Sequence, residues 1–196
     1  MPDHAHIPDD IRQLYEIHDC RHAAAILACE FPKEHKEIYQ VLRSFRFTEE
    51  QIIKPGGSES EIPKEFSKLL RPMGWAEGKL KAKLIVDDTE ITSDTHKIDY
   101  LKNKIAFDLE WNSKDQTFDR DLYAFRAFFD YHRISMGILV TRSQELNPYF
   151  RKLGLFQKYG ASTTHMGKLL PRLNAGRSGG CPVLVLGITT RLLKTS

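Results

Sequence analysis

Large apolar side chains occupy every second position over residues 105–112, whose sequence is IAFDLEWN, and they alternate with polar ones from Phe107 to Asn112. A β-strand points successive side chains to opposite faces, so this alternation predicts a strand with one buried face. Two acids, Asp108 and Glu110, then share the other face with Asn112, about 7 Å apart along the backbone. The strand presents two anionic groups on a stiff support, opposite an apolar row formed by Ile105, Phe107, Leu109 and Trp111.

A third acid, Asp99, lies upstream in a second apolar frame with the sequence IDYL. Residues 102–104, Lys-Asn-Lys, are short and polar enough to form a turn between the two runs. A hairpin at this turn would bring the carboxylates of Asp99, Asp108 and Glu110 together. Clustered carboxylates repel one another, which raises their proton affinity unless a cation neutralises them.

Magnesium is the cation that such a cluster favours, because Mg²⁺ binds oxygen ligands, keeps several waters and shares its coordination with substrate phosphates. A metal held in this way can polarise a phosphoryl group and supply a hydroxide nucleophile, which is the chemistry of phosphodiester hydrolysis. The spacing alone is also typical of acids that are solvated on the outward face of an amphipathic strand. Both interpretations follow from the residues, and the choice between them needs a further signal.

A family resemblance supplies this signal over two parts of the chain. The segment from Asp99 to Thr141, with an acid on one strand and acid-x-acid on the next, resembles the BglII and BstYI group of type II restriction endonucleases, in the PD-(D/E)xK nuclease superfamily. The segment from Asn174 to Ile188 is similar to the glycine-arginine loop and closing apolar strand of the same enzymes. The resemblance implies an α/β fold like that of restriction endonucleases, with a mixed central sheet flanked by helices.

The resemblance also implies catalytic roles. Asp99 and Asp108 would hold Mg²⁺ against the scissile phosphate of double-stranded DNA. Glu110 would help to bind or deprotonate the attacking water, leaving a 5′-phosphate and a 3′-hydroxyl. The chain departs from the superfamily pattern because no proline precedes Asp99, and because Glu110 stands where a lysine is usual and can act only as a base or a second metal ligand. Glu77 is expected either to add a metal ligand or to be an exposed loop acid.

Base recognition is expected to involve other residues, because phosphate contacts position a duplex while contacts to base edges discriminate sequence. The segment directly after the acid-bearing strand is similar to base-contacting positions of the related enzymes, and its members are Asn112, Ser113 and Lys114. Arg142 and Arg177 are expected to reach a guanine or a phosphate, or else to be surface arginines. Lys81 belongs to a lysine row, with Lys79 and Lys83, that either contacts phosphates or protects an edge strand from aggregation.

Composition fits one soluble domain. The chain has 196 residues, 41% of them apolar, and we expect a single endonuclease domain over 1–196, with a helical part at about 1–72 and a catalytic sheet core at about 73–196. No apolar run approaches the roughly 18 residues that span a bilayer, and the polar start MPDHAHIPDD favours a cytoplasmic location without membrane contact. Three cysteines without metal-ligand spacing indicate reduced thiols, and the net charge of +3 favours nucleic acid only weakly.

Hydrophobic periodicity predicts helices and strands around the acid-bearing segment. Helices are expected over 9–15, 21–30, 34–45, 63–70 and 118–132, a loop over 54–60, and strands over 80–86, 134–140 and 180–188. The interval 147–168 is mostly polar but contains aromatic residues that either pack or stack on bases. A mixed sheet with flanking helices follows from this order of elements.

The family resemblance implies sequence-specific cleavage at a short palindromic site, and two-fold symmetric sites favour a homodimer. It also implies a restriction-modification system, in which a cognate DNA methyltransferase is a genetic partner and not a bound one. Two alternatives remain open from the residues. One is another PD-(D/E)xK-type nuclease, such as a repair or junction-resolving enzyme. The other is a noncatalytic DNA-binding protein in which the acids are solvated or structural.

Overall fold

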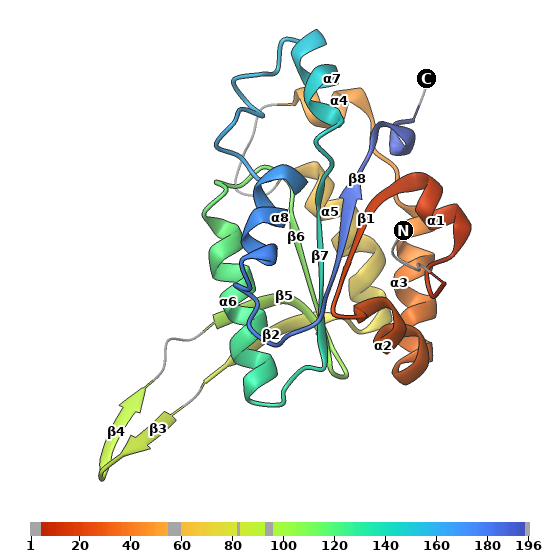
Figure 1. Cartoon of the computed structure of the whole chain (residues 1–196). Coiled ribbons are helices and arrows are strands. Elements are labelled where there is room, and N and C mark those ends of the chain that lie inside the picture. The colour runs from red at the N-terminus through yellow and green to blue at the C-terminus, as the bar shows by residue number, and fades with distance from the viewer. Residues whose placement is uncertain (1–4, 55–59, 82, 93–95, 195–196) are drawn as a thin grey trace.

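A six-stranded mixed sheet forms the centre of the molecule (Figure 1). The computed structural model describes residues 5–54, 60–81, 83–92 and 96–194. The order of strands across the sheet is β1 (Tyr15–Cys20), β8 (Val183–Ile188), β7 (Met136–Arg142), β6 (Ile105–Glu110), β5 (His96–Lys102) and β2 (Ala76–Leu80). The acid-bearing strand β6 therefore lies inside the sheet, between β5 and β7.

The two acid-bearing segments form the hairpin that the sequence predicts. β5 and β6 are antiparallel, with Lys102 opposite Ile105, and Asn103 takes a left-handed conformation in the turn, with φ 52°. β6 is parallel to β7, and β7 is parallel to β8, so the carboxyl ends of these strands lie at the same edge of the sheet. Glu110 at the end of β6 is opposite Thr141 near the end of β7.

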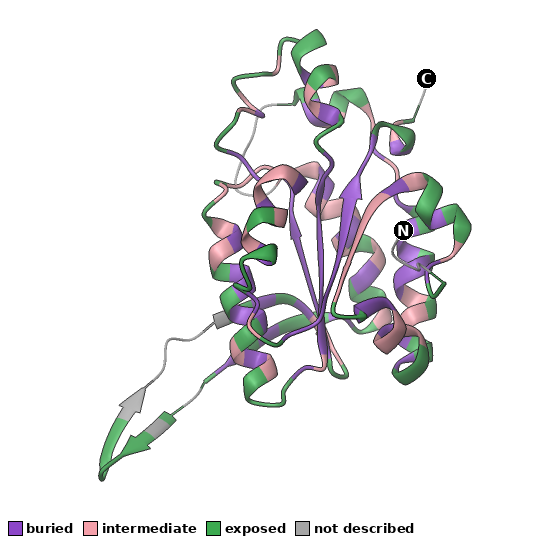
Figure 2. Cartoon of the chain, in the orientation of Figure 1, coloured by how far each residue is buried: buried purple, intermediate pink, exposed green. Residues whose placement is uncertain are grey.

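Helices cover both faces of the sheet, and the central strands β6, β7 and β8 are buried, whereas β1 at the edge is mostly of intermediate burial (Figure 2). The first face packs against α7 (Leu146–Lys152) and the N-terminal helices, which are α1 (Asp9–Leu14), α2 (Ala23–Glu30), α3 (Pro32–Ser44), α4 (Glu49–Ile53) and α5 (Glu61–Leu70). The second face packs against α6 (Thr117–Asp130) and α8 (Met166–Asn174). Short 3-10 helices, η1 (Arg71–Met73) and η2 (Thr190–Leu192), follow α5 and β8.

The alternation along β6 places its side chains as the sequence predicts. Ala106 belongs to the core on the second face, beside α6, and the alternation directs Asp108 and Glu110 to that same face. A slip of one residue would expose the apolar row, each member of which stabilises the fold by about 1.5–3 kcal/mol when fully buried. This row belongs to the core on the first face and consists of Ile105, Phe107, Leu109 and Trp111.

Two parts of the predicted element order are wrong. The first third of the chain is not only helical, because Tyr15–Cys20 forms β1 at the edge of the sheet, antiparallel to β8. The part at 1–72 therefore supplies a strand to the sheet as well as helices. The strand expected over 80–86 is also divided: β2 ends at Leu80, and β3 (Lys83–Val86) pairs with β4 (Thr89–Thr92) in a two-stranded ribbon that extends away from the sheet (Figure 1).

The other predicted elements agree with the structure to within a few residues. The expected helices correspond to α1, α2, α3, α5 and α6, and the strands expected over 134–140 and 180–188 correspond to β7 and β8. The loop expected over 54–60 falls largely on residues 55–59, outside the described ranges. Over the part of the chain that is described, no helix combines the length and the apolar character needed to cross a membrane.

Candidate active site

Asp108 is held in place by the neighbouring strand. Its Oδ1 accepts a hydrogen bond from the backbone N–H of Asp99 at 2.7 Å, just beyond the Tyr100–Phe107 pair of the hairpin. The Asp108 side chain is buried, with the residue 3% exposed, whereas Asp99 is exposed. The backbone of β5 thus orients the Asp108 carboxylate and brings two of the three expected catalytic acids together.

Glu110 and a residue of α6 complete an acidic cluster, which we define as Asp99, Asp108, Glu110 and Asp121. Asp121 is buried, as is Glu110. Arg120 Nη2 lies 3.1 Å from Asp121 Oδ1 and 3.5 Å from Glu110 Oε1, so one guanidinium contacts two of the carboxylates. Since the cluster has more carboxylates than guanidinium groups, it carries an excess of negative charge when all its members are ionised.

Sequence reasoning missed Asp121, although the chain contains a signal for it. Residues three and four apart share one face of a helix. Asp121 is three residues after Phe118 and four before Phe125, and both phenylalanines are fully buried. An acid on the apolar face of a helix is costly unless it is paired, so such a position marks a candidate functional residue.

Desolvation raises the pKa of every carboxyl group in the acidic cluster, even that of Asp99, which is the most exposed of the four. The pKa of Asp108 is well above its usual range, first because of desolvation and then because of the charges of Asp99 and Glu110. Desolvation, followed by the charges of Glu110 and Asp108, raises the pKa of Asp121 to about 9. The pKa values of Asp99 and Glu110 are also raised, mainly by desolvation, although Arg120 acts against the rise at both. The cluster is therefore stabilised by taking up protons or a metal cation.

Two oxygens of the acidic cluster, Asp108 Oδ2 and Asp121 Oδ2, are buried and, as carboxylate oxygens, have no hydrogen-bond partner within the described residues. A hard divalent cation takes such oxygens as ligands, so the donor set fits one. Within residues 5–54, 60–81, 83–92 and 96–194, no three His, Cys, Asp or Glu side chains are arranged to hold a metal by themselves. The cluster would thus supply only part of a coordination shell, with water and phosphate oxygens completing it, which is typical of magnesium sites.

Glu77 lies at the outer side of the acidic cluster. It belongs to β2, which pairs with β5 on the side away from β6. Its Oε1 is 3.7 Å from Lys97 Nζ and 3.8 Å from Lys79 Nζ, and its side chain is about half exposed. The charge of Glu77 adds a small part to the raised pKa of Asp99, after the larger contribution of desolvation. The structure therefore links Glu77 to the cluster through Asp99.

The residues that follow β6 lie beside the acidic cluster. A side-chain hydrogen bond with Ser113 lowers the pKa of Glu110, against the larger effect of its burial. Asn112 Oδ1 is buried and has no partner among the residues that the structure describes. Lys114 pairs with Thr163 in an isolated bridge, which fixes the backbone at this point. Three of the expected DNA-binding residues are thus placed next to the expected catalytic acids.

The structure corrects the expectation that Arg142 contacts DNA. Arg142 is fully buried. Its guanidinium donates hydrogen bonds to Thr164 O at 2.7 Å and to Asn147 Oδ1 at 3.0 Å, and also to Thr163 Oγ1. In this position its donors join parts of the protein interior, so the guanidinium does not reach a groove of DNA.

Arg177 and Lys81 are exposed, as contacts with DNA require. Arg177 follows α8 and forms an ion pair with Asp119 in the first turn of α6. Lys81 lies between β2 and β3, so the expected lysine row is not on one strand, and Lys83 Nζ is 2.7 Å from Glu90 Oε1 in the separate ribbon.

Comparison with known protein families matches residues 15–188 to the family described as restriction endonuclease BglII/BglIII. The match begins at the first residue of β1 and ends at the last residue of β8, so it spans the whole six-stranded sheet. It also includes every member of the acidic cluster. No curated protein matches the chain at a significant level.

Proposed function

The chain belongs to the BglII family of restriction endonucleases, which matches residues 15–188 of its 196, and we propose that it cuts both strands at a short palindromic site with Mg²⁺ as its metal. As a member of this family, the protein is a type II sequence-specific deoxyribonuclease that acts on double-stranded DNA. Restriction endonucleases generally depend on a divalent metal.

The main observation that supports Asp108 as a metal ligand is that its buried Oδ2 has no hydrogen-bond partner within the described residues. Because the Asp99 N–H holds Oδ1 at 2.7 Å, the carboxylate is oriented by the protein but not satisfied by it. The Asp99 carboxylate, close enough for its charge to raise the pKa of Asp108 after burial, is the second ligand in this proposal. Mg²⁺ bound by these two residues would polarise the scissile phosphate and activate a water.

Glu110 takes the proton from the attacking water in the proposed reaction. Its raised pKa, caused mainly by burial, makes it a better proton acceptor than an exposed glutamate. As the proton moves to a Glu110 carboxylate oxygen, the water oxygen bonds to phosphorus, the bond from phosphorus to the 3′ oxygen breaks, and the leaving 3′ oxygen takes a proton from solvent water. The products are a 5′-phosphate and a 3′-hydroxyl. This role lets a glutamate act where the wider superfamily has a lysine.

Asp121 and Arg120 position Glu110. Because the pKa of Asp121 is about 9, this group keeps its proton at neutral pH, and a hydrogen bond between Asp121 and Glu110 lowers the pKa of Glu110. Arg120 contacts both groups, at 3.1 and 3.5 Å. Asp121 is therefore a positioning residue that helps Glu110 to remain an ionised base.

Base recognition is proposed for the segment directly after β6, which consists of Asn112, Ser113 and Lys114. The buried, unpartnered Oδ1 of Asn112 shows that this side chain has hydrogen-bonding capacity that the described protein groups leave unused. An amide can bond both the acceptor and the donor on an adenine edge in the major groove. Arg177 and Lys81, which are exposed, are proposed as further DNA contacts, and Glu77 as an outer metal ligand that acts beside Asp99.

A homodimer is proposed because one acidic cluster cuts one strand, and a palindromic site relates its two strands by a two-fold axis. Two large aromatic side chains are exposed, Tyr123 on α6 at 49% and Tyr131 directly after the helix at 47%, which is consistent with a contact surface on this side of the molecule. A cognate DNA methyltransferase would protect the host DNA at the same site.

Digestion of supercoiled plasmid with Mg²⁺, followed by sequencing of the ends, tests this function. The wild-type protein should give discrete fragments with 5′-phosphate ends, EDTA should stop the reaction, and Asp108→Asn should be inactive. Asp130→Asn is the matched control, because Asp130 lies on α6 but is exposed and pairs with Arg126 at 3.5 Å. It should cut like the wild type.

Three results would contradict the proposal. Cleavage that persists in EDTA would show that the reaction needs no metal, and full activity of Asp108→Asn would show that Asp108 is not an essential metal ligand. Preferential cutting of a four-way junction over linear duplex would show that the protein recognises branched DNA and not a short base sequence.

A further inference from the structure

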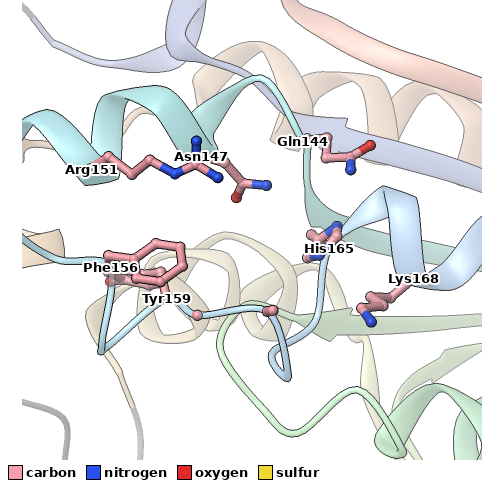
Figure 3. A pocket seen from close by; sticks show the side chains of 9 residues that line it. Gln144, Asn147, Arg151, Phe156, Tyr159, His165 and Lys168 are labelled. Atoms are coloured by element: carbon pink, nitrogen blue, oxygen red, sulfur yellow. The ribbon is translucent and has the colours of Figure 1, made fainter.

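A pocket of about 250 Å³ opens between α7 and the start of α8, beyond the carboxyl end of β7 (Figure 3). Figure 3 shows Arg151 and Asn147 on α7 facing Phe156 and Tyr159 of the following loop. His165 and Lys168 line the side nearest α8. We call this space the α7–α8 pocket. No residue of the acidic cluster lines it.

The charged side chains that line the α7–α8 pocket are basic. Arg151 and Lys168 both line it, and none of the described lining residues is acidic. The Arg151 guanidinium lies 5.4 Å from the centre of the Phe156 ring, and no carboxylate contacts it in the described part of the chain. Lys168 Nζ is 3.8 Å from Asp115 Oδ2, a long separation for an ion pair. The pocket therefore offers positive charge that the protein itself compensates only in part.

His165 lines the pocket, and one of its ring nitrogens is an unpaired polar atom buried behind the pocket wall. The residue is only 6% exposed, and its Nδ1 is buried with no hydrogen-bond partner among the described residues. A buried polar atom of this kind costs free energy unless a ligand or water satisfies it. His165 is also the N-cap of α8, a helix of 9 residues, and its side chain does not cap the helix. The first N–H groups of α8 add the partial positive charge that favours an anion.

Arg142 makes the α7–α8 pocket rigid from beneath. Its guanidinium bonds Asn147 in α7, Thr163 and Thr164 just before α8, and Tyr159 O at 3.5 Å in the loop between them. One buried side chain thus joins both walls. The polar groups of the pocket are held at fixed positions before any ligand binds, which reduces the entropy lost on binding.

The same wall is joined to the segment that follows the catalytic strand. Thr164 N–H donates to Ser113 O at 2.9 Å, and Asp115 N–H donates to Ser162 O at 3.0 Å. These backbone contacts place the pocket and the acidic cluster at the same edge of the sheet, in one connected unit. A duplex whose scissile phosphate lies at the acidic cluster therefore passes near the pocket with another part of its backbone.

We propose that the α7–α8 pocket binds a phosphate group of the DNA backbone and positions the duplex for cleavage. Arg151 and Lys168 supply the charge, and the ring of His165 supplies a hydrogen bond. This inference rests on the proposed function, because DNA is the ligand. A phosphate contact carries no information about base sequence, so the pocket should add affinity equally to all duplexes.

The salt dependence of DNA binding tests this inference without cleavage. Binding of a 20-base-pair duplex of mixed sequence is measured in EDTA at several salt concentrations. Each phosphate contact that is lost should reduce the slope of log Kobs against log salt by about 0.9. Arg151→Ala and Lys168→Ala should each reduce the slope in this way. His165→Phe, which keeps a ring but removes the nitrogen atoms, should weaken binding without changing the slope, because desolvation lowers the pKa of His165 to about 4 and keeps it neutral.

Lys152→Ala is the matched control, since Lys152 neighbours Arg151 on α7, is exposed, and does not line the pocket. It should leave the slope unchanged. An equal loss in Lys152→Ala would show a general basic surface, and unchanged binding in Arg151→Ala and Lys168→Ala would leave the pocket without a role. A loss confined to the cleaved sequence would show a base contact instead. Each of these results overturns the phosphate site.

The two proposals can fail separately. If the protein never cuts DNA but Arg151→Ala still reduces the slope, the catalytic assignment fails and the phosphate pocket stands. If the protein cuts DNA and the pocket variants bind like the wild type, the pocket assignment alone fails.

Discussion

The carboxyl ends of β6 and β7 are neighbours in the sheet, yet they carry opposite charges. β6 ends at Glu110 and leads into the acidic cluster, in which Arg120 contacts only part of the negative charge. β7 ends at Arg142, a fully buried cation that contacts no carboxylate within the described ranges. The two ends are in register, with Glu110 opposite Thr141.

The protein compensates these two charges in different ways. The guanidinium of Arg142 donates hydrogen bonds to carbonyl, hydroxyl and amide oxygens of the protein, so its buried charge is stabilised without any ligand. Asp108 keeps one buried oxygen without a partner among the described residues, although its other oxygen is hydrogen-bonded. A buried charge that the protein satisfies supports the fold, and one that it leaves unsatisfied is available to a metal or substrate.

The largest effect is expected at the acidic end. Glu110→Gln keeps the size of the side chain but removes the proton acceptor, and loss of a general base lowers rates by about 10²–10⁴-fold. Single-turnover cleavage of a plasmid at saturating enzyme measures this rate. DNA binding in EDTA should remain at least as tight, because a negative charge near the phosphates is removed.

Glu77→Gln is the comparison for this change, because Glu77, proposed as an outer metal ligand, is half exposed and linked to the acidic cluster through Asp99. Its rate should fall less than about 10-fold, below the range expected for a general base. If both variants lose activity equally, Glu110 is a metal ligand like the others and not the base.

The next effect concerns folding at the basic end. Arg142→Met fills the same space with an apolar side chain but removes the guanidinium. The acceptors of Thr164, Asn147 and Tyr159 then lose their donor. Each unsatisfied buried group costs about 1–3 kcal/mol, so we expect a loss of about 3 kcal/mol in the free energy of unfolding. Urea denaturation measures it. Arg177→Met, at an exposed position, should change the free energy by less than about 0.5 kcal/mol.

A stable Arg142→Met variant would show that the comparison between the two ends is mistaken. In that case the guanidinium would be dispensable to the fold, and its buried charge would need a functional explanation like that of the acidic cluster.

Short-range patterns predicted the acidic end of the sheet well. The alternation over 105–112 depends only on the strand period, and the turn at 102–104 depends on local polar residues, so both could be predicted from the sequence. The proximity of Asp99 to Asp108 could be predicted for this reason. The expectation for the β5–β6 hairpin is confirmed by the pairing of Lys102 with Ile105.

Tertiary contacts decided what the sequence could not predict. β1 has a polar sequence, YEIHDC, and becomes a strand because β8, from the other end of the chain, supplies its hydrogen-bond partners. Arg142 follows an apolar strand like any surface arginine, and its burial depends on α7 and the loop before α8. Asp121 joins the acidic cluster only because α6 packs on the face of β6 that holds Asp108 and Glu110.

A smaller effect is expected from the protonation of Asp121, a member of the acidic cluster. The pKa of Asp121 is raised from 3.8 to about 9, first by burial, so the folded state holds a proton that the unfolded state releases. The stability that this group contributes is therefore complete below pH 3.8 and is lost as pH rises toward 9. Between pH 6.5 and 8.0, a window above the usual pKa of histidine, one proton of difference lowers the free energy of unfolding by about 2 kcal/mol.

Chemical denaturation in EDTA at both pH values measures this slope. Asp121→Asn, which cannot titrate, should make this slope shallower, and the exposed Asp130→Asn should not. An identical slope in Asp121→Asn and wild type would mean that Asp121 does not hold the proton.

The smallest effect is expected where the two ends meet, at Asn112. The residue follows the catalytic strand, and the next residue, Ser113, is bonded to the wall of the α7–α8 pocket through Thr164. If Asn112 reads a base edge, Asn112→Ala should lower the preference for the cleaved sequence over a single-base variant by about 1 kcal/mol, or roughly fivefold. Binding of both duplexes in EDTA measures this ratio. Arg151→Ala should weaken both duplexes by the same factor and leave the ratio unchanged, because a phosphate contact is blind to sequence. Equal weakening of both duplexes in Asn112→Ala would instead assign this residue to the backbone, and base reading would then have to come from elsewhere on the DNA-facing edge.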